Sequence, residues 1–305
     1  MIFRTIVDIP KPGFEIQPCE KMLFVGSCFA NEIGQRFQEN GFPVAVNPYG
    51  TMYNPASILH TVERYFADPK LTGGQTLCEE NRTWGLSPCE VPQTVFLTLG
   101  TNHVYRLKET GEIVDNCEKR PQNLFQEEQL SIEACVTYLQ KTVDVLRQRN
   151  PDVRVVLTVS PIRYRKYGYH ESQLSKATLL LAIDRLTTSR TPAPSHPRTP
   201  APPNLVYYFP AYEILTDELR DYRFYAPDML HPSQQAVDYV WERLVDSCFS
   251  AAAKTFLDEW RPLKQILAHR PFNPDAEEYK ALMQKTMQQV DDLRKKYKPV
   301  NVLMR

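Results

Sequence analysis

An apolar run that ends in a Gly-Ser pair and passes directly into a helical pattern most constrains how this chain can fold. The run covers residues 21–26, and the helical pattern covers residues 28–40. This sequence predicts a strand, a tight turn carrying the Ser27 hydroxyl, and a helix. Such a turn directs the side chain out of the sheet edge, and the unpaired N–H groups of the first helical turn point to the same place.

Strand-like and helix-like segments alternate along the rest of the chain. The patterns predict strands at 42–46, 94–99, 154–159 and 205–209, a hairpin at 105–114, and helices at 55–66, 131–149, 171–188, 211–222 and 233–249. Helices of ten or more residues between strands are typical of a parallel sheet covered on both faces. We therefore expect an α/β domain with a mainly parallel sheet over residues 1–250.

Two segments differ from this pattern. Residues 189–204 form a run of Pro, Thr and Ala with no core-forming residues, which predicts a flexible, extended loop. We interpret it as an insertion, with a recognition segment as the alternative. Residues 251–305 form a helical extension with a stripe that includes Leu282, Val290 and Leu293. We expect this extension to pack against the main domain, with a dimer contact as the alternative.

Composition excludes several classes of partner. Lys and Arg together number 36, as do Asp and Glu, so the net charge is zero at pH 7. Such a balance does not favour nucleic acid or an anionic membrane surface. No apolar run is long enough to span a membrane, and the first residues lack the pattern of a signal peptide. We therefore expect a cytoplasmic protein that binds neither nucleic acid nor membrane; its oligomeric state is left open.

The cysteines and histidines do not indicate a metal site. Seven cysteines are scattered along the chain without Cys-x-x-Cys or zinc-like Cys/His spacing, which predicts free, buried thiols. His103 and His231 could approach each other, but no third ligand accompanies them. We therefore expect no metal and no cofactor.

Polar and flexible residues gather where the predicted strands end. Because ligands of open parallel sheets bind outside the carboxyl ends of the strands, these residues define a candidate site. They are Ser27, Gly50, Gly100, Thr101, Asn102, Ser160, Asp228 and His231. Together they supply a nucleophile, a glycine turn whose backbone is not covered by a side chain, an amide donor and an acid–base pair.

This inventory suits acyl transfer. A serine hydroxyl needs a base to take its proton, and histidine suits that role because its unperturbed pKa lies near neutrality. Asp228 can orient His231 and stabilise the imidazolium, and the N–H groups of Ser27 and Gly50 with the Asn102 amide could bind an oxyanion. Each residue also has a structural alternative: a helix cap for Ser27, Asp228 and His231, and turn formation for Asn102. Cys28, at the same helix start, is a rival nucleophile.

Several runs resemble the GSCFA family, a bacterial branch of the SGNH/GDSL-type hydrolases. The signature of that family stands at residues 26–30, and further similar runs cover 47–50, 98–101, 159–163, 173–177, 208–213, 221–233 and 269–274. The resemblance implies a three-layer α/β/α fold and a Ser27–Asp228–His231 triad, with Gly50 and residues 100–102 near the oxyanion. It also implies ester substrates, including acetylated sugars.

Four departures from the family pattern keep a second reading open. Asn102, Glu118 and Tyr164 replace the usual family residues, and the segment 84–95 is shorter than in most members. From the residue inventory and the family resemblance together, we predict a serine hydrolase acting on acyl or acetyl esters of a small molecule or carbohydrate. The alternatives are a binding or structural protein that has lost the chemistry, and an acyltransferase that uses the same triad.

Overall fold

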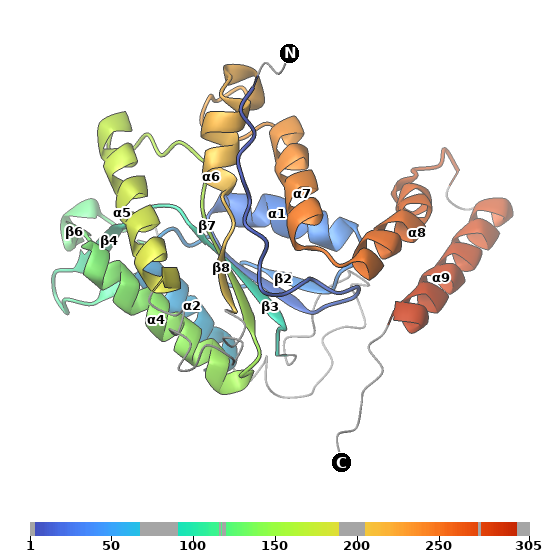
Figure 1. The fold of residues 1–305 in the computed structure, drawn as a ribbon, viewed down its shortest axis with the longest axis horizontal. Helices are drawn as coiled ribbons and strands as arrows, with labels where there is room; N and C mark the ends of the chain where they lie inside the picture. The colour runs from blue at the N-terminus through green and yellow to red at the C-terminus, as the bar shows by residue number, and fades with distance from the viewer. Residues whose placement is uncertain are drawn as a thin grey trace, which may run out of the picture.

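A five-stranded parallel sheet forms the centre of the protein. The computed structural model describes residues 4–67, 91–115, 117, 120–188, 205–273 and 276–297. The strands lie in the order β2-β1-β3-β7-β8, and every neighbouring pair is parallel (Figure 1). Their bounds are β1 Met22–Gly26, β2 Val44–Val46, β3 Thr94–Leu99, β7 Arg154–Val159 and β8 Val206–Tyr208. The predicted parallel sheet is confirmed.

Helices cover both faces of this sheet. Met22 and Phe24 of β1 join one core cluster, whereas Leu23 and Val25 join the other, since successive side chains of a strand point to opposite faces. The first cluster is covered by α1 (Cys28–Glu39), α7 (Gln234–Cys248) and α8 (Ala251–Ala268). The second is covered by α2 (Pro55–Ala67), α4 (Ile132–Arg149) and α5 (Tyr169–Thr188). The fold is therefore a three-layer α/β/α sandwich, as the resemblance implied.

A second, antiparallel sheet was only half predicted. The expected hairpin is present as β4 (His103–Leu107) and β5 (Ile113–Val114), and β6 (Phe125–Gln129), preceded by a 3-10 turn at Gln122–Leu124, pairs with the other side of β4. The sequence of β6 is Phe-Gln-Glu-Glu-Gln, and only Phe125 is buried. Because this strand lacks apolar alternation, its pattern did not indicate a strand; the pairing with β4 creates it.

The predicted helix at 211–222 is shorter and irregular. It consists of α6 (Ala211–Glu213) followed by π-helical Ile214–Leu219, and a separate 3-10 turn occupies Tyr222–Phe224. Arg220 takes a left-handed backbone conformation, and its N–H donates to the carbonyl of Leu215. This left-handed residue ends the helix, so the prediction was wrong at its carboxyl end.

The C-terminal helices extend the first face of the sandwich. Trp260 of α8 is buried against Gly41, and its indole N–H donates to the carbonyl of Glu39 at 2.8 Å. Helix α9 (Glu277–Tyr297) lies beside α8 at the outer end of the molecule (Figure 1). Its Val290 and Leu293 belong to the same core cluster as Trp260. The domain boundary near residue 250 stays a prediction, and the Pro-rich run 189–204 lies outside the described residues.

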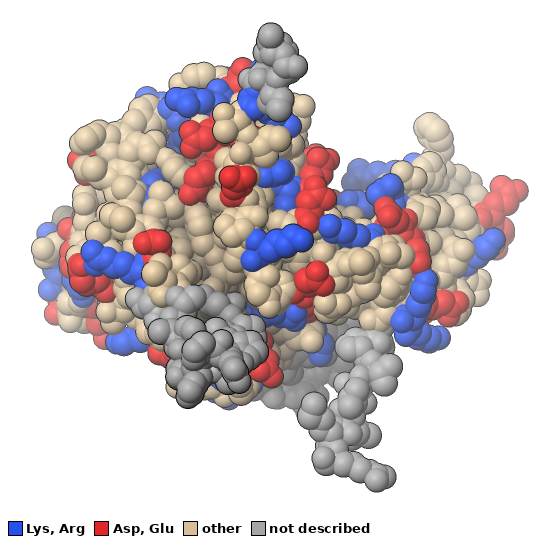
Figure 2. Space-filling model, viewed as in Figure 1, with Lys and Arg blue, Asp and Glu red and all other residues tan. Residues whose placement is uncertain are grey.

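The surface carries both charges intermixed. Lys and Arg side chains alternate with Asp and Glu side chains over the face drawn in Figure 2, in keeping with the net charge of zero. Among the described residues, no helix has the length and apolar character needed to cross a bilayer. Five of the seven cysteines are described, and none of these five forms a disulfide. The predicted burial holds for Cys135 and Cys248, whereas Cys19, Cys28 and Cys117 are only half-buried.

Candidate active site

Ser27 stands at the carboxyl end of β1 and caps α1. Its side chain is buried, and Oγ accepts a hydrogen bond from the Phe29 N–H at 3.3 Å. The preceding glycine is required by the neighbouring strand, because a Cβ on Gly26 would lie 2.2 Å from the carbonyl oxygen of Thr98. Asn47 fixes the same turn by accepting from the Gly26 N–H at 2.8 Å. The Gly-Ser signature therefore has a structural cause, and the predicted capping role of Ser27 is confirmed alongside its place at the strand end.

Two loops join this turn at the same edge of the sheet. The loop after β2 donates from the Met52 N–H to the carbonyl of Gly26 at 2.9 Å. The carbonyl of Tyr53 accepts from the N–H groups of Gly100 and Thr101, at 2.7 and 2.9 Å. The carboxyl ends of β1, β2 and β3 are thus tied together by backbone hydrogen bonds, as expected for a site at the strand ends.

Helix α5 holds the loop that follows β3. Ser175 Oγ accepts from the Asn102 N–H at 2.9 Å and lies 3.0 Å from Thr101 Oγ1, and all three residues are buried. The Asn102 side chain donates from Nδ2 to the carbonyl of Leu130 at 2.8 Å. Asn102 Oδ1 is buried and has no hydrogen-bond partner in the described part of the chain. Buried hydrogen bonds to α5 and to Leu130 thus hold this loop in place.

Asp228 and His231 form an acid–imidazole pair in the connection between β8 and α7. His231 Nδ1 lies 2.5 Å from Asp228 Oδ2, and Asp228 Oδ1 accepts from the N–H groups of Leu230 and His231. These backbone hydrogen bonds, followed by the one to the His231 ring, lower the pKa of Asp228 to about 2. Both side chains are nearly half exposed, and α7 is capped by Ser233 rather than by Asp228. The pair is therefore accessible to solvent.

Long-range contacts bring this pair to the edge that carries Ser27. Arg163, in the loop after β7, bonds to the carbonyls of Leu230 and Met229 through its N–H and its guanidinium, at 3.0 and 3.1 Å. Helix α7 is bound to α1 where Gln234 donates to Glu32 at 3.0 Å. Among the described residues, no hydrogen bond joins Ser27 Oγ to the His231 ring, so the triad stays a prediction.

The predicted oxyanion donors are occupied by protein carbonyls. The Ser27 N–H donates to Thr98 at 3.1 Å, and the Gly50 N–H donates to Asn47 at 2.8 Å within its own turn. Asn102 Nδ2 has a second hydrogen beyond the one given to Leu130. An oxyanion at this edge would compete with these carbonyls, so the roles of Gly50, Gly100, Thr101 and Asn102 also stay predictions.

A buried lysine lies beneath the same edge. Lys176 follows Ser175 on α5, is only 3% exposed, and donates from Nζ to the carbonyl of Ser160 at 2.7 Å. Burial lowers the pKa of this ammonium group to about 7. Lys176 thereby holds the end of β7, from which the loop containing Arg163 departs.

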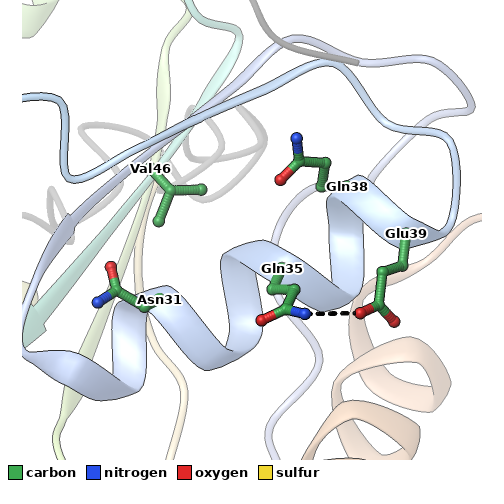
Figure 3. Close-up of a pocket in the computed structure, with 5 residues that line it drawn as sticks. All are labelled: Asn31, Gln35, Gln38, Glu39 and Val46. Atoms are coloured by element: carbon green, nitrogen blue, oxygen red, sulfur yellow. Dashed lines mark hydrogen bonds between the residues drawn. The ribbon is translucent and has the colours of Figure 1, made fainter. Parts of the chain in front are cut away.

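The other candidates are placed less favourably. Cys28 Sγ lies 3.4 Å from the hydroxyl of Tyr53 and is half-buried. No group of three or more His, Cys, Asp or Glu side chains in the described ranges could hold a metal ion. A hollow of about 380 Å³ lies between α1 and β2, and its lining includes Val46 of β2 and Asn31, Gln35, Gln38 and Glu39 of α1 (Figure 3). Glu39 is the acid among its described lining residues, and it is bound by Gln35 and Lys264, so these residues offer no free acid–base pair.

Comparison with known families decides where the chain belongs. The sequence model of the GSCFA family matches residues 21–91 and 86–244. The chain belongs to the GSCFA family. A second model, the C-terminal domain of the GSCFA domain protein, matches residues 260–304, which include the second half of α8 and all of α9. No curated protein matches this GSCFA sequence.

Solved structures with a partly similar arrangement include three esterases. An acetyl esterase mutant with an acetate ion has 11% identity and a TM-score of 0.39, over 80% of this chain and 99% of its own. A family 3 carbohydrate esterase from Talaromyces cellulolyticus has 10% identity and a TM-score of 0.37, over 80% of this chain and 99% of its own. A family two carbohydrate esterase from Clostridium thermocellum in complex with cellohexaose has 16% identity and a TM-score of 0.33, over 79% and 66%. The esterase activities named here belong to those three proteins.

Sequence reasoning missed the residues that support this site in the GSCFA protein. No role was predicted from the sequence for Arg163, Ser175 or Lys176, although each of them lies in a run that resembles the family. The only available signal was that resemblance, because a helix residue reaching a distant loop leaves no local pattern. Of the departures, Tyr164 lies in the loop after β7, whereas Glu118 and residues 84–90 lie outside the described part of the chain.

Proposed function

We propose that this protein is a serine esterase or deacylase in which Ser27 is the nucleophile, His231 the base and Asp228 the residue that orients it. The observation that carries the proposal is the contact of Asp228 Oδ2 with His231 Nδ1 at 2.5 Å. This contact fixes the imidazole tautomer, so that Nε2 is left to take a proton. Asp228 Oδ1 is held by two backbone N–H groups, which keeps the carboxylate in place.

The proposed reaction has two steps. Ser27 Oγ attacks the ester carbonyl while His231 Nε2 takes its proton, and the same proton then passes to the leaving alcohol as the acyl-enzyme forms. Water attacks the acyl-enzyme while His231 takes its proton, and the imidazolium returns that proton to Ser27 Oγ as the acyl–Oγ bond breaks and the acid is released. The substrates are acyl or acetyl esters of a small molecule or a carbohydrate, as the family resemblance implies. With an acceptor alcohol in place of water the same triad would transfer the acyl group, and product analysis separates the two.

A second candidate function is binding without turnover. It is favoured by the hydrogen bonds that the N–H groups of Ser27 and Gly50 make to Thr98 and Asn47, because an oxyanion hole needs such donors to be available. A fluorophosphonate probe distinguishes the candidates, since it labels an activated serine. An adduct on Ser27 supports the esterase, and an unlabelled protein supports the binding role.

The substitution Ser27→Ala tests the esterase directly. We expect it to abolish hydrolysis of p-nitrophenyl acetate while the folded structure persists. The matched control is Ser250→Ala, because Ser250 caps α8 through the Ala253 N–H at 3.1 Å and lies at a different helix start. Each substitution removes an N-cap worth about 1 kcal/mol, so a loss of turnover confined to Ser27→Ala is chemical. Equal turnover by Ser27→Ala and the parent protein would refute the proposal.

A further inference from the structure

The small sheet presents an organised polar and aromatic face beside the candidate active site. Its register places Tyr105 opposite Glu127 and Leu107 opposite Phe125 on β4 and β6. Directly opposite residues of antiparallel strands share a face, and His103, two residues before Tyr105, lies on the same face. His103, Tyr105, Phe125 and Glu127 therefore form one surface, to which β5 adds Val114 opposite Tyr105.

The loop after β7 packs onto this surface and leaves a hollow. Tyr167 stacks on His103 with ring centroids 3.8 Å apart and planes within 6°. Lys166 donates to the hydroxyl of Tyr105, and its Nζ lies 4.3 Å from the centroid of that ring. The hollow has a volume of about 360 Å³, which is in the range of small-molecule pockets. Its lining includes Tyr105, Arg120, Gln122, Phe125, Glu127 and Lys166.

A row of aromatic rings connects the hollow to the residues around Ser27. The hydroxyl of Tyr53 contacts Cys28, the residue after Ser27. The ring of Tyr53 lies 6.0 Å from that of Tyr164, which lies 5.4 Å from that of Tyr167, and the hydroxyl of Tyr167 is bonded to that of Tyr105. Two walls of the hollow thus come from segments that start at the strand ends of the main sheet: β4, which follows Asn102, and the loop that follows Ser160. The remaining lining comes from β6 and the residues before it.

The charges of the hollow are not neutralised by direct contact. The carboxylate of Glu127 is engaged at both oxygens, by His103 Nδ1 at 2.7 Å and by the Tyr105 hydroxyl at 3.2 Å. Within the described ranges, Lys166 forms no ion pair with a carboxylate, and its contacts are the Tyr105 hydroxyl and the Tyr105 and Tyr167 rings. Likewise, the guanidinium of Arg120 lies over the Phe125 ring, 5.1 Å from its centroid, with no carboxylate partner in those ranges. Among the described residues, two cations and one acid, Glu127, therefore line this hollow, so positive charge is in excess there.

We propose that this hollow binds the alcohol part of the substrate, and that this part is a sugar-like ring bearing a negative charge. Lys166 and Arg120 would bind the anionic group, and by turning toward it they would leave the faces of Tyr105 and Phe125, over which they now lie, to contact the ring. A sugar carboxylate and a sugar phosphate share this chemistry. The inference rests on the proposed function, since it assigns the substrate class of the same site.

Equilibrium binding to the full-length protein tests the inference without any turnover. Calorimetry would compare glucuronate, glucose 6-phosphate and uncharged glucose with the unaltered protein at low salt. We expect at least one charged sugar to bind about tenfold or more tightly than glucose, because a charge-assisted hydrogen bond contributes on that scale. Tighter binding of glucuronate identifies a carboxylate as the ligand group, and tighter binding of glucose 6-phosphate identifies a phosphate. Equal binding of charged and uncharged sugars overturns the inference.

A substitution locates the binding. Lys166→Met should weaken binding of the preferred charged sugar about tenfold. Lys141→Met is the matched control, because Lys141 is an exposed lysine on α4 away from the hollow, and it should leave binding unchanged. Unchanged binding in Lys166→Met refutes the assignment to this hollow. Failure of the proposed function is a separate result, since it would appear as unchanged ester turnover in Ser27→Ala.

Discussion

Gln234 donates a hydrogen bond to Glu32 at 3.0 Å, and this contact connects two helices that are far apart in the chain. Glu32 lies in the first turns of α1, shortly after Ser27, and Gln234 opens α7, shortly after His231. Arg36 strengthens the same connection through Gln234 and Asp238, at 2.6 and 2.7 Å. The helix starts that carry the proposed nucleophile and base are thereby held on one side of the sheet.

Asp228→Asn should lower kcat for ester hydrolysis about 100-fold or more, because the neutral amide can neither fix the imidazole tautomer nor stabilise the imidazolium. The amide oxygen can still accept from the backbone, so the fold should persist. Since the pKa of Asp228 is about 2, its carboxylate stays charged at ordinary assay pH, and any loss of rate on mild acidification has another cause. Steady-state kinetics at pH 7 measures the effect.

The control for this substitution is Asp221→Asn. Asp221 is also exposed and also accepts a backbone N–H two residues ahead, from Arg223 at 2.9 Å. It should keep the parental kcat. If both variants lose activity equally, the effect of Asp228 arises from loop structure and not from its action on the His231 ring.

Ser175→Ala should lower kcat about tenfold with little change in KM, because the Asn102 N–H loses its acceptor and the loop after β3 loses its fixed position. The buried N–H left without a partner should also lower the free energy of unfolding by about 1–3 kcal/mol. Thr178→Ala on the same helix is the control, since Thr178 bonds only within α5. A parental kcat in Ser175→Ala, with lower stability, would limit Ser175 to a structural role.

Lys176→Met should increase stability in a pH-dependent way. The folded protein releases the Lys176 proton at about pH 7, whereas the unfolded chain keeps it to about pH 10.5, so the stability of the parent protein rises with pH between these values. The variant lacks this dependence. The variant loses the hydrogen bond to Ser160 at both pH values, so that loss cancels when the two are compared. The free energy of unfolding of Lys176→Met, relative to that of the parent protein, should therefore be about 2–5 kcal/mol higher at pH 6.5 than at pH 10.5.

Urea unfolding at the two pH values measures this difference. Lys141→Met should show no comparable change with pH, because Lys141 is exposed in the folded state. An advantage of Lys176→Met that is independent of pH would show that the buried ammonium group is not destabilised by desolvation.

Trp260→Ala should lower the free energy of unfolding by about 3–5 kcal/mol, because it leaves a cavity between α8 and the end of α1. Trp260→Phe should cost less, since it keeps most of the buried ring and removes chiefly the hydrogen bond to Glu39. Leu282→Ala, at a 42% exposed position on α9, should change stability by about 0.5 kcal/mol or less. Urea unfolding compares the three, and an equal effect of Trp260→Ala and Leu282→Ala would refute docking of α8 on the domain.

Local sequence alone determined most of the secondary structure and the position of Ser27. Strand and helix periods are properties of neighbouring residues, so the segments around β1, α1, β3 and β7 could be predicted with their buried faces. The Asp228–His231 contact was also accessible, since the two residues are only three apart.

Only the tertiary structure decided what surrounds these residues. The pairing of β6 with β4, the occupation of the Ser27 and Gly50 N–H groups by Thr98 and Asn47, and the support of Asn102 by Ser175 were all beyond local prediction. Most of these contacts join residues far apart in the chain, and the short one, within the turn at Gly50, depends on the backbone conformation of that turn. A hydrogen bond between distant segments depends on how the layers pack, and periodicity carries no information about that packing.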